Sequence, residues 1–295
     1  MSETLESLGR KMEGAVELES VVRTMKAMAA ANIGEYEMAV HSLGDYFHNI
    51  ALGIIAYFRQ QRIDVIPQEK KNGQRMIYAI VFGSDQGLVG QFNDVLFDYA
   101  VKSLNNLTDK KEVWAVGERI QLRFSESNLV PINLFPVPNS VKAITALITQ
   151  ILVHIEESWN HDKMSSFYIY HNQPNQGTGY EPVSQRLLPL DETWRQGLVK
   201  LTWPTKQSPQ IVGALRPTLL MLIGEYLFVS LFKACAESMT SENSSRLVAM
   251  QRAEKNIAEL LQGFKQKYHR LRQSSIDMEL LDVISGYESQ IVLKN

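Results

Sequence analysis

A glycine-rich segment is the first feature of the sequence that could do chemistry. In FGSDQGLVGQFN, residues 82–93, the glycines Gly83, Gly87 and Gly90 would let backbone amides approach an anion between a predicted strand and a predicted helix. The spacing is neither GxGxxG nor GxxxxGK followed by Ser or Thr, and no acid ends the next strand at the distance that dinucleotide binding requires. The pattern leaves nucleotide binding open but favours a tight turn that permits close helix packing.

Side chains that bind metals or transfer protons form no recognisable constellation in the sequence. The histidines are scattered, and His41 and His48 are seven residues apart, not the three or four that bring two ligands together on a helix. No GxSxG, HExxH or paired-carboxylate pattern occurs, and Cys235 lies in an apolar helical run without a nearby histidine. We therefore predict no catalytic residue, no metal site and no cofactor, with surface or hydrogen-bonded histidines and a buried, inert Cys235.

The charge balance gives no signature of nucleic acid or anionic lipid as a partner. Lys plus Arg number 30 against 32 for Asp plus Glu, a formal net charge of −2. The basic segment KQKYHRLR, residues 265–272, is followed at once by acids. This pattern favours a solvated helix face and leaves a charged contact with a protein partner as the alternative.

Composition is typical of a soluble globular protein. Apolar residues make up 45% of the chain, and a single cysteine excludes an internal disulfide framework and suits a reducing compartment. The N-terminal residues have no apolar core of a signal peptide. The most apolar stretch, residues 219–232, is 14 residues long and contains Glu225, so we expect no membrane span.

Proline placement and a seven-residue repeat predict the elements at both ends. No proline occurs in residues 1–61 or after Pro217, and apolar residues recur every seven positions in both segments. This repeat predicts two helices, about 90 Å and 110 Å long at 1.5 Å per residue, that pair as a coiled coil. Polar residues interrupt the rows at Glu19, Lys26, Asn243 and Ser285. The rows are Leu5, Met12, Glu19, Lys26, Ile33, Val40, Phe47, Ile54 and Leu8, Ala15, Val22, Ala29, Tyr36, Leu43, Ile50, Tyr57 in the first segment, and Leu222, Val229, Ala236, Asn243, Met250, Ile257, Phe264, Leu271, Met278, Ser285, Val292 in the second.

The middle of the chain alternates predicted strands and helices. Strands are expected at residues 76–82, 113–116 and 166–171, with an edge strand at 183–188, and helices at 91–104 and 141–157, whereas Pro131, Pro136 and Pro138 mark a loop. This alternation predicts an α/β domain with a largely parallel sheet. The predicted organisation is therefore a long helix at 1–61, a central Rossmann-like α/β domain at 62–210, and a second long helix at 211–295 that pairs antiparallel with the first.

This organisation and three groups of motifs resemble the gamma subunit of rotary F-type ATP synthases. TMKAMAAANI, residues 24–33, is similar to the KAM stretch of that family, and SDQGLVGQFN, residues 84–93, resembles its glycine turn. The C-terminal motifs are SRLVAM at 245–250, YHRLRQSSI at 268–276 and ELLDVISG at 279–286. Gln86 and Asp277 stand where that family usually has arginine and threonine. With these departures the chain resembles the alternative, often sodium-linked branch of the family.

The resemblance implies a mechanical role. The paired helices would be the central shaft inside a catalytic hexamer of alpha and beta subunits, and the α/β domain would join the shaft to the epsilon subunit and the ion-driven membrane c-ring. The chain itself would bind no nucleotide and would be a non-catalytic, peripheral subunit on the cytoplasmic side of the inner membrane. By the same resemblance, the residues expected to contact the hexamer are Lys26, Met28, Arg246, Arg272, Gln273, Glu279 and Asp282.

The residues alone leave two other classes of function open. One is a nucleotide-dependent α/β enzyme with helical arms for oligomerisation, which the lack of a phosphate-binding motif disfavours. The other is a static coiled-coil scaffold, for which the heptads would suffice. A scaffold would leave the middle domain and the C-terminal motif unexplained.

Overall fold

The computed structural model describes residues 4–61, 76–161, 165–175, 179–190, 194, 203, 207 and 210–292 of the 295. The chain divides into two compact units. Unit 1 comprises Met1–Met28 and Leu247–Asn295, and unit 2 comprises Ala29–Arg246. The junction at residues 62–75, where the middle domain was expected to begin, lies outside the described residues.

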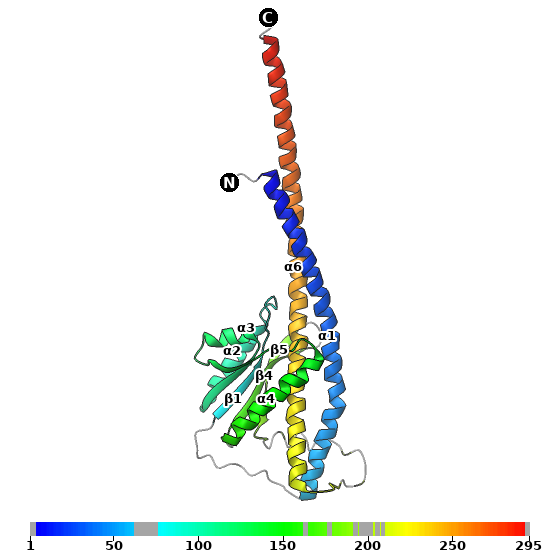
Figure 1. The fold of residues 1–295 in the computed structure, drawn as a ribbon, viewed down its shortest axis with the longest axis vertical. Helices are drawn as coiled ribbons and strands as arrows, with labels where there is room; N and C mark the ends of the chain where they lie inside the picture. The colour runs from blue at the N-terminus through cyan, green and yellow to red at the C-terminus, as the bar shows by residue number, and fades with distance from the viewer. Residues whose placement is uncertain are drawn as a thin grey trace. The chain divides into compact units, whose positions relative to one another are not determined.

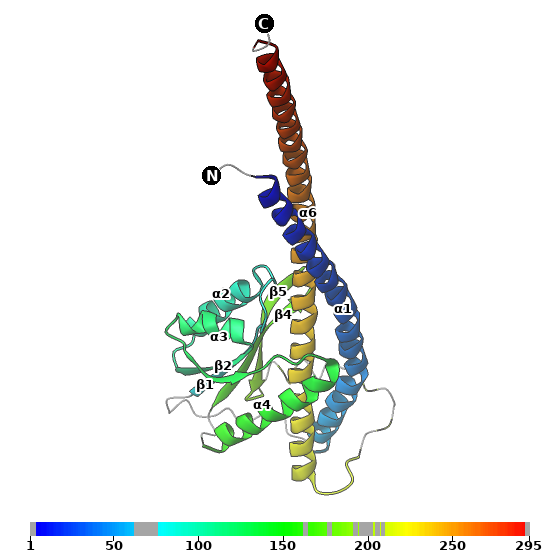
Figure 2. The same cartoon turned by 45° about the horizontal axis from the view of Figure 1, so that its top comes forward.

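Two long helices confirm the prediction from the seven-residue repeat. Helix α1 (Leu5–Gln61) has 57 residues and helix α6 (Leu215–Val292) has 78. Every member of the two predicted rows in α1 is buried or half-buried, and so is the α6 row from Leu222 to Leu271. In unit 1, Leu8 and Ala15 of α1 and Leu261 of α6 are buried where the two helices lie side by side (Figures 1 and 2). Apolar burial along one stripe of each helix therefore closes the pair.

Unit 2 contains a five-stranded sheet in the order β3-β2-β1-β4-β5. The first four strands are parallel and β5 pairs antiparallel with β4 at the edge, which confirms the predicted α/β class. The strands are β1 (Met76–Phe82), β2 (Lys110–Val116), β3 (Pro131–Phe135), β4 (Ser166–Pro174) and β5 (Tyr180–Leu188), and the helices between them are α2 (Phe92–Asn105), α3 (Glu118–Ser125) and α4 (Val141–His161).

Helices cover both faces of this sheet because successive strand residues point to opposite sides. On one face, Ala79 and Val113 pack with residues of α2 and α3, such as Leu96. On the other face, Ile80 and Trp114 join one apolar core with α4 and with the unit 2 parts of α1 and α6. Figure 1 shows α2 and α3 on the side of the sheet away from α4. The long helices are thus part of the core of the α/β domain.

One strand of the sheet was not predicted from the sequence. The expectation of a loop from Pro131 was wrong, because residues 131–135 form β3. Pro131 is the first residue of an edge strand, a position at which the missing amide hydrogen costs no ladder bond, so this proline does not end the strand.

The apolar start of α6 resembles a membrane-spanning helix by composition. One 18-residue window within Leu215–Ser285 reaches a mean hydropathy of 1.7, and half of that window is buried inside the structure. Val229, Leu231 and Ala236 are among the α6 residues in the unit 2 core. Packing against the sheet and α1 therefore accounts for these apolar side chains.

The seam in unit 1 predicts a sharp difference between two neighbouring leucines. Leu261 is 8% exposed and Leu260 is 55% exposed. We expect Leu261→Asp to lower the free energy of unfolding by about 3 kcal/mol, because it places an unpaired charge in the seam, and Leu260→Asp to change it by less than about 1 kcal/mol. Thermal and urea unfolding of the full chain, followed by helical circular dichroism, measures both. Equal effects of the two variants would contradict this placement of the seam.

Candidate functional site

The crevice that binds ligands in doubly wound α/β folds is filled by α6. The strand order reverses between β1 and β4, and ligands in such sheets bind outside the carboxyl ends of the strands at this point. Here Ser238 donates its hydroxyl hydrogen to the Phe82 carbonyl at 2.9 Å, and Ser241 donates to the Asn172 carbonyl at 2.9 Å. A third hydroxyl on the same face of α6, that of Ser245, donates to the carbonyl of Val89. Small hydroxyl side chains thus let the helix approach the strand ends closely.

The glycine turn is engaged by the chain's own side chains. The Ser84 amide donates to Asn93 Oδ1 at 3.1 Å, and Asn93 Nδ2 donates to Ser84 Oγ at 2.9 Å. A Cβ on Gly83 would lie 2.3 Å from Ile120 Cβ, so glycine is required for α3 to pack here. These contacts favour the interpretation of this segment as a packing turn over that of an anion site.

Asp85 occupies the place at which α3 could receive an anion. Its Oδ1 accepts the Glu118 amide and its Oδ2 accepts the Val137 amide, both at 2.9 Å. A carboxylate is favourable at a helix N-terminus because free amides and the helix dipole point toward it. Asp85 therefore caps α3 and joins the ends of β1 and β3.

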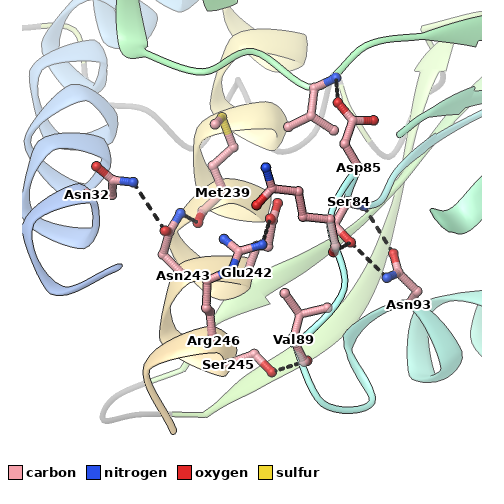
Figure 3. A network of polar contacts seen from close by, with 12 residues as sticks. Asn32, Ser84, Asp85, Val89, Asn93, Met239, Glu242, Asn243, Ser245 and Arg246 are labelled. Atoms are coloured by element: carbon pink, nitrogen blue, oxygen red, sulfur yellow. Dashed lines mark hydrogen bonds and ion pairs between the residues drawn. The ribbon is translucent and has the colours of Figure 1, made fainter. Parts of the chain in front are cut away.

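A buried ion pair lies next to this turn, on α6 (Figure 3). Arg246 Nη2 donates to Glu242 Oε1 at 2.6 Å, and the Arg246 side chain is only 11% exposed. Burial raises the pKa of the Glu242 carboxyl, and the Arg246 guanidinium partly offsets that rise. One turn away, Asn32 Nδ2 of α1 donates to Asn243 Oδ1 at 3.4 Å. The polar residue that interrupts the α6 row is thus hydrogen-bonded across the two helices.

His171 is the histidine that packs into the interface between β4 and α6. Its Nε2 lies 2.9 Å from Glu237 Oε2, and both side chains are buried. Gln173 and Lys233 also approach the Glu237 carboxylate, at 3.4 Å and 3.7 Å. The expectation of a hydrogen-bonded histidine is confirmed for His171. Cys235 is buried as predicted, and burial raises the pKa of its thiol, which keeps the sulfur protonated.

Six of the seven residues expected to contact a partner lie in unit 1. Met28 is 61% exposed on α1. On α6, Arg272, Gln273, Glu279 and Asp282 are all exposed. The seventh, Arg246, belongs to unit 2 and is the largely buried partner of Glu242 described above.

Lys26, which the resemblance assigns to a contact with the hexamer, is bonded to the other long helix. Its ammonium group forms a direct ion pair with Glu254 of α6. Arg23 Nε lies 3.8 Å from the other oxygen of Glu254, and Arg23 Nη2 lies 2.8 Å from Glu19 Oε1. Sequence reasoning missed Glu254, although it stands seven residues from both Leu247 and Leu261 and so interrupts a second apolar row of α6.

Removing the Asp85 carboxylate is expected to destabilise unit 2. Asp85→Ala loses two charge-assisted hydrogen bonds, and we expect it to lower the free energy of unfolding by about 3 kcal/mol. We expect Asp85→Asn to lower it by about half as much, because one amide oxygen remains as an acceptor. Urea unfolding of the full chain measures this. The matched control is Asp98→Ala, an exposed acid on α2, for which we expect less than about 0.5 kcal/mol. A change for Asp85→Ala as small as that of the control would contradict the capping role.

Known proteins match this chain over nearly its whole length. The family described as ATP synthase matches residues 4–289. A protein named ATP synthase gamma chain from Ehrlichia canis (strain Jake) is 24% identical over 97% of this chain and 98% of its own length. A protein of the same name from Wolbachia sp. subsp. Drosophila simulans is 25% identical over 97% of this chain and 99% of its own.

Solved structures share the fold. A chain in the cryo-EM structure of Euglena gracilis mitochondrial ATP synthase with OSCP, F1 and c-ring, rotational state 3, aligns with a TM-score of 0.64 at 16% identity over 99% of this chain and 96% of its own. A chain of the rotor of that synthase, rotational state 1, gives a TM-score of 0.58 at 15% identity over 92% and 98%. Because the family match covers nearly every residue, this protein belongs to the ATP synthase family, which confirms its resemblance to gamma subunits.

Proposed function

We propose that this chain is the central rotor shaft of an F-type ATP synthase. It couples rotation of an ion-driven ring to conformational changes at the catalytic sites of an alpha–beta hexamer. The observation that carries the proposal is the docking of α6 in the ligand crevice of the sheet, where three hydroxyls bond to backbone carbonyls. The α/β domain is thereby bound to a helix, and its usual ligand position is used for attachment.

Torque requires that the α/β domain and the helices turn together. In unit 2 the sheet, α4, α1 and α6 share one apolar core, so the domain cannot rotate about α6 without breaking many packed contacts. The hydroxyl bonds from Ser238 and Ser241 end on the backbone of β1 and β4, which is less free to move than a side chain. A force on the domain therefore reaches α6 directly, and α6 continues as one helix into unit 1.

The C-terminal part of α6 has the surface expected of a shaft that turns inside a collar. Large apolar side chains gather there and are exposed by 47–72%. Apolar contacts are non-directional, so they can be exchanged during rotation more easily than ion pairs, which hold one geometry. These side chains are Ile276, Met278, Leu280, Leu281, Val283 and Ile284.

Specific contacts with the hexamer would come from the seven residues named above, of which all but Met28 are polar or charged. Arg272 can donate two parallel hydrogen bonds to a carboxylate of a partner loop, and Gln273, Glu279 and Asp282 offer further exposed polar groups on the same helix. Met28 presents a flexible thioether that adapts to a moving partner. In this proposal Arg246 also contacts the hexamer, while it stays paired with Glu242.

The coupling follows from asymmetry. A shaft that presents different side chains at each angle favours a different conformation at each catalytic site, and rotation shifts these populations in turn. The chain would itself be non-catalytic. It would meet the epsilon subunit and the membrane c-ring through the α/β domain, as a peripheral subunit on the cytoplasmic side of the inner membrane.

Reconstitution tests the proposal. The cognate alpha and beta subunits are expressed with and without this chain, and the complexes are purified by size exclusion and assayed for ATP hydrolysis. We expect a stable complex with one copy of the chain per three alpha–beta pairs and full activity only when the chain is present. A chain that elutes alone and leaves hydrolysis unchanged would contradict the rotor function and favour a static scaffold.

Met28→Lys tests the proposed contact on α1. A cation at this exposed site would replace the apolar contact proposed between Met28 and the hexamer, which we expect to uncouple hydrolysis from rotation and to lower the number of ions pumped per ATP several-fold. ATP-driven ion pumping in vesicles, divided by the hydrolysis rate, measures this ratio. Met38→Lys is the matched control, since Met38 is 66% exposed on the same helix. An unchanged ratio for Met28→Lys, with the complex assembled, would refute the contact.

A further inference from the structure

Unit 1 contains a charged pair at seam positions, Lys26 with Glu254, of which the proposed function uses only Lys26, as a contact with the hexamer. Lys26 belongs to a seven-residue row of α1, between Glu19 and Ile33, and Glu254 belongs to a seven-residue row of α6, between Leu247 and Leu261. The Lys26 and Glu254 side chains are only 31% and 27% exposed. Arg23 approaches the second oxygen of Glu254 and is itself paired with Glu19. Four charged groups thus meet where apolar packing alone would close the helices.

The core of unit 2 anchors both helices, but in unit 1 the repeating apolar seam does not by itself determine which residues of α1 and α6 meet. If one helix slides along the other by seven residues, apolar side chains again face apolar side chains, so packing changes little. A polar residue at a seam position removes this freedom, because a half-buried charge without its partner is costly. Specifying register is the best-attested use of such groups in coiled coils.

Both alternative registers are unfavourable for this pair. Because the helices run antiparallel, a slip in one direction places Glu254 against Glu19 and Lys26 against Leu247. A slip in the other direction places Glu254 against Ile33 and Lys26 against Leu261. The first alternative opposes two acids, and both leave a charge against an apolar side chain. The observed register is the one in which the two charges meet.

We propose that Glu254 is a positioning residue that fixes the register of α1 against α6 in unit 1 by its ion pair with Lys26. Arg23 supports the pair from the adjacent turn of α1. By fixing the register, Glu254 determines which α6 residues lie level with the exposed Met28. This last consequence rests on the proposed rotor function, whereas the register itself does not.

Distances between spin labels in the full chain test the proposal. Labels are attached to Glu13→Cys on α1 and Gln251→Cys on α6, both exposed sites of unit 1, and the native Cys235 is buried and stays unlabelled. A slip of one heptad changes the separation of the labels by about 10 Å. The background receives Glu254→Lys, the charge-swapped pair Lys26→Glu with Glu254→Lys, or the control Glu259→Lys. Glu259 pairs with Lys255 on the same helix at 3.9 Å, so its reversal leaves the contact between helices intact.

We expect one narrow distance distribution for the unchanged background and the Glu259→Lys control. Glu254→Lys is expected to broaden it or add a population displaced by about 10 Å, and the charge-swapped pair is expected to restore it. A distribution unchanged by Glu254→Lys, or a swapped pair that does not restore it, would overturn the proposal. If Glu254→Lys does not fold, Glu254→Gln decides by the same criterion. The distances are read without ATP or hexamer, so failure of the rotor function would leave this result interpretable.

Discussion

The apolar seam between α1 and α6 is the interaction on which the rest of the structure depends. Apolar burial in a continuous stripe makes helices of 57 and 78 residues stable as elements far longer than a globular core needs. In unit 2 the same two helices also complete the core of the α/β domain. Helix α6 therefore packs against two partners with two different faces of its own. Its apolar residues contact α1, and its small hydroxyl residues contact the strand ends.

Three buried or half-buried carboxylates in these interfaces are tolerated because each has a defined partner. Glu242 is held by Arg246, Glu237 by His171, and Glu254 by Lys26. Such pairs add little net stability over apolar packing, but removing one member is costly. They add specificity of arrangement to the seam. In a subunit that transmits force, specificity of arrangement matters more than additional stability, because the hexamer must meet the same side chains at the same angle in every turn.

Period and proline placement made the long helices and most of the sheet predictable from the sequence, because they act within a few turns of one element. Strand β3 was not predicted, because Pro131 indicates a loop unless the strand is known to lie at the edge of the sheet. The exposure of Met28 and Arg272 was consistent with the sequence motifs, but the partner of Lys26 was not foreseen. It lies 228 residues away in the chain, and periodicity alone does not state which residues of two helices meet. The same limit applies to Asp85, whose two amide donors become visible only when three strand ends come together.

Direct observation of rotation tests the central claim most simply. The alpha–beta hexamer is fixed to a surface, and a bead is attached to the α/β domain through Asn105→Cys, an exposed site at the end of α2, while the buried Cys235 stays unlabelled. The account predicts that ATP causes the bead to turn continuously in one direction, and that rotation stops when ATP is removed. A bead that only fluctuates about a fixed position while the hexamer hydrolyses ATP would contradict the account.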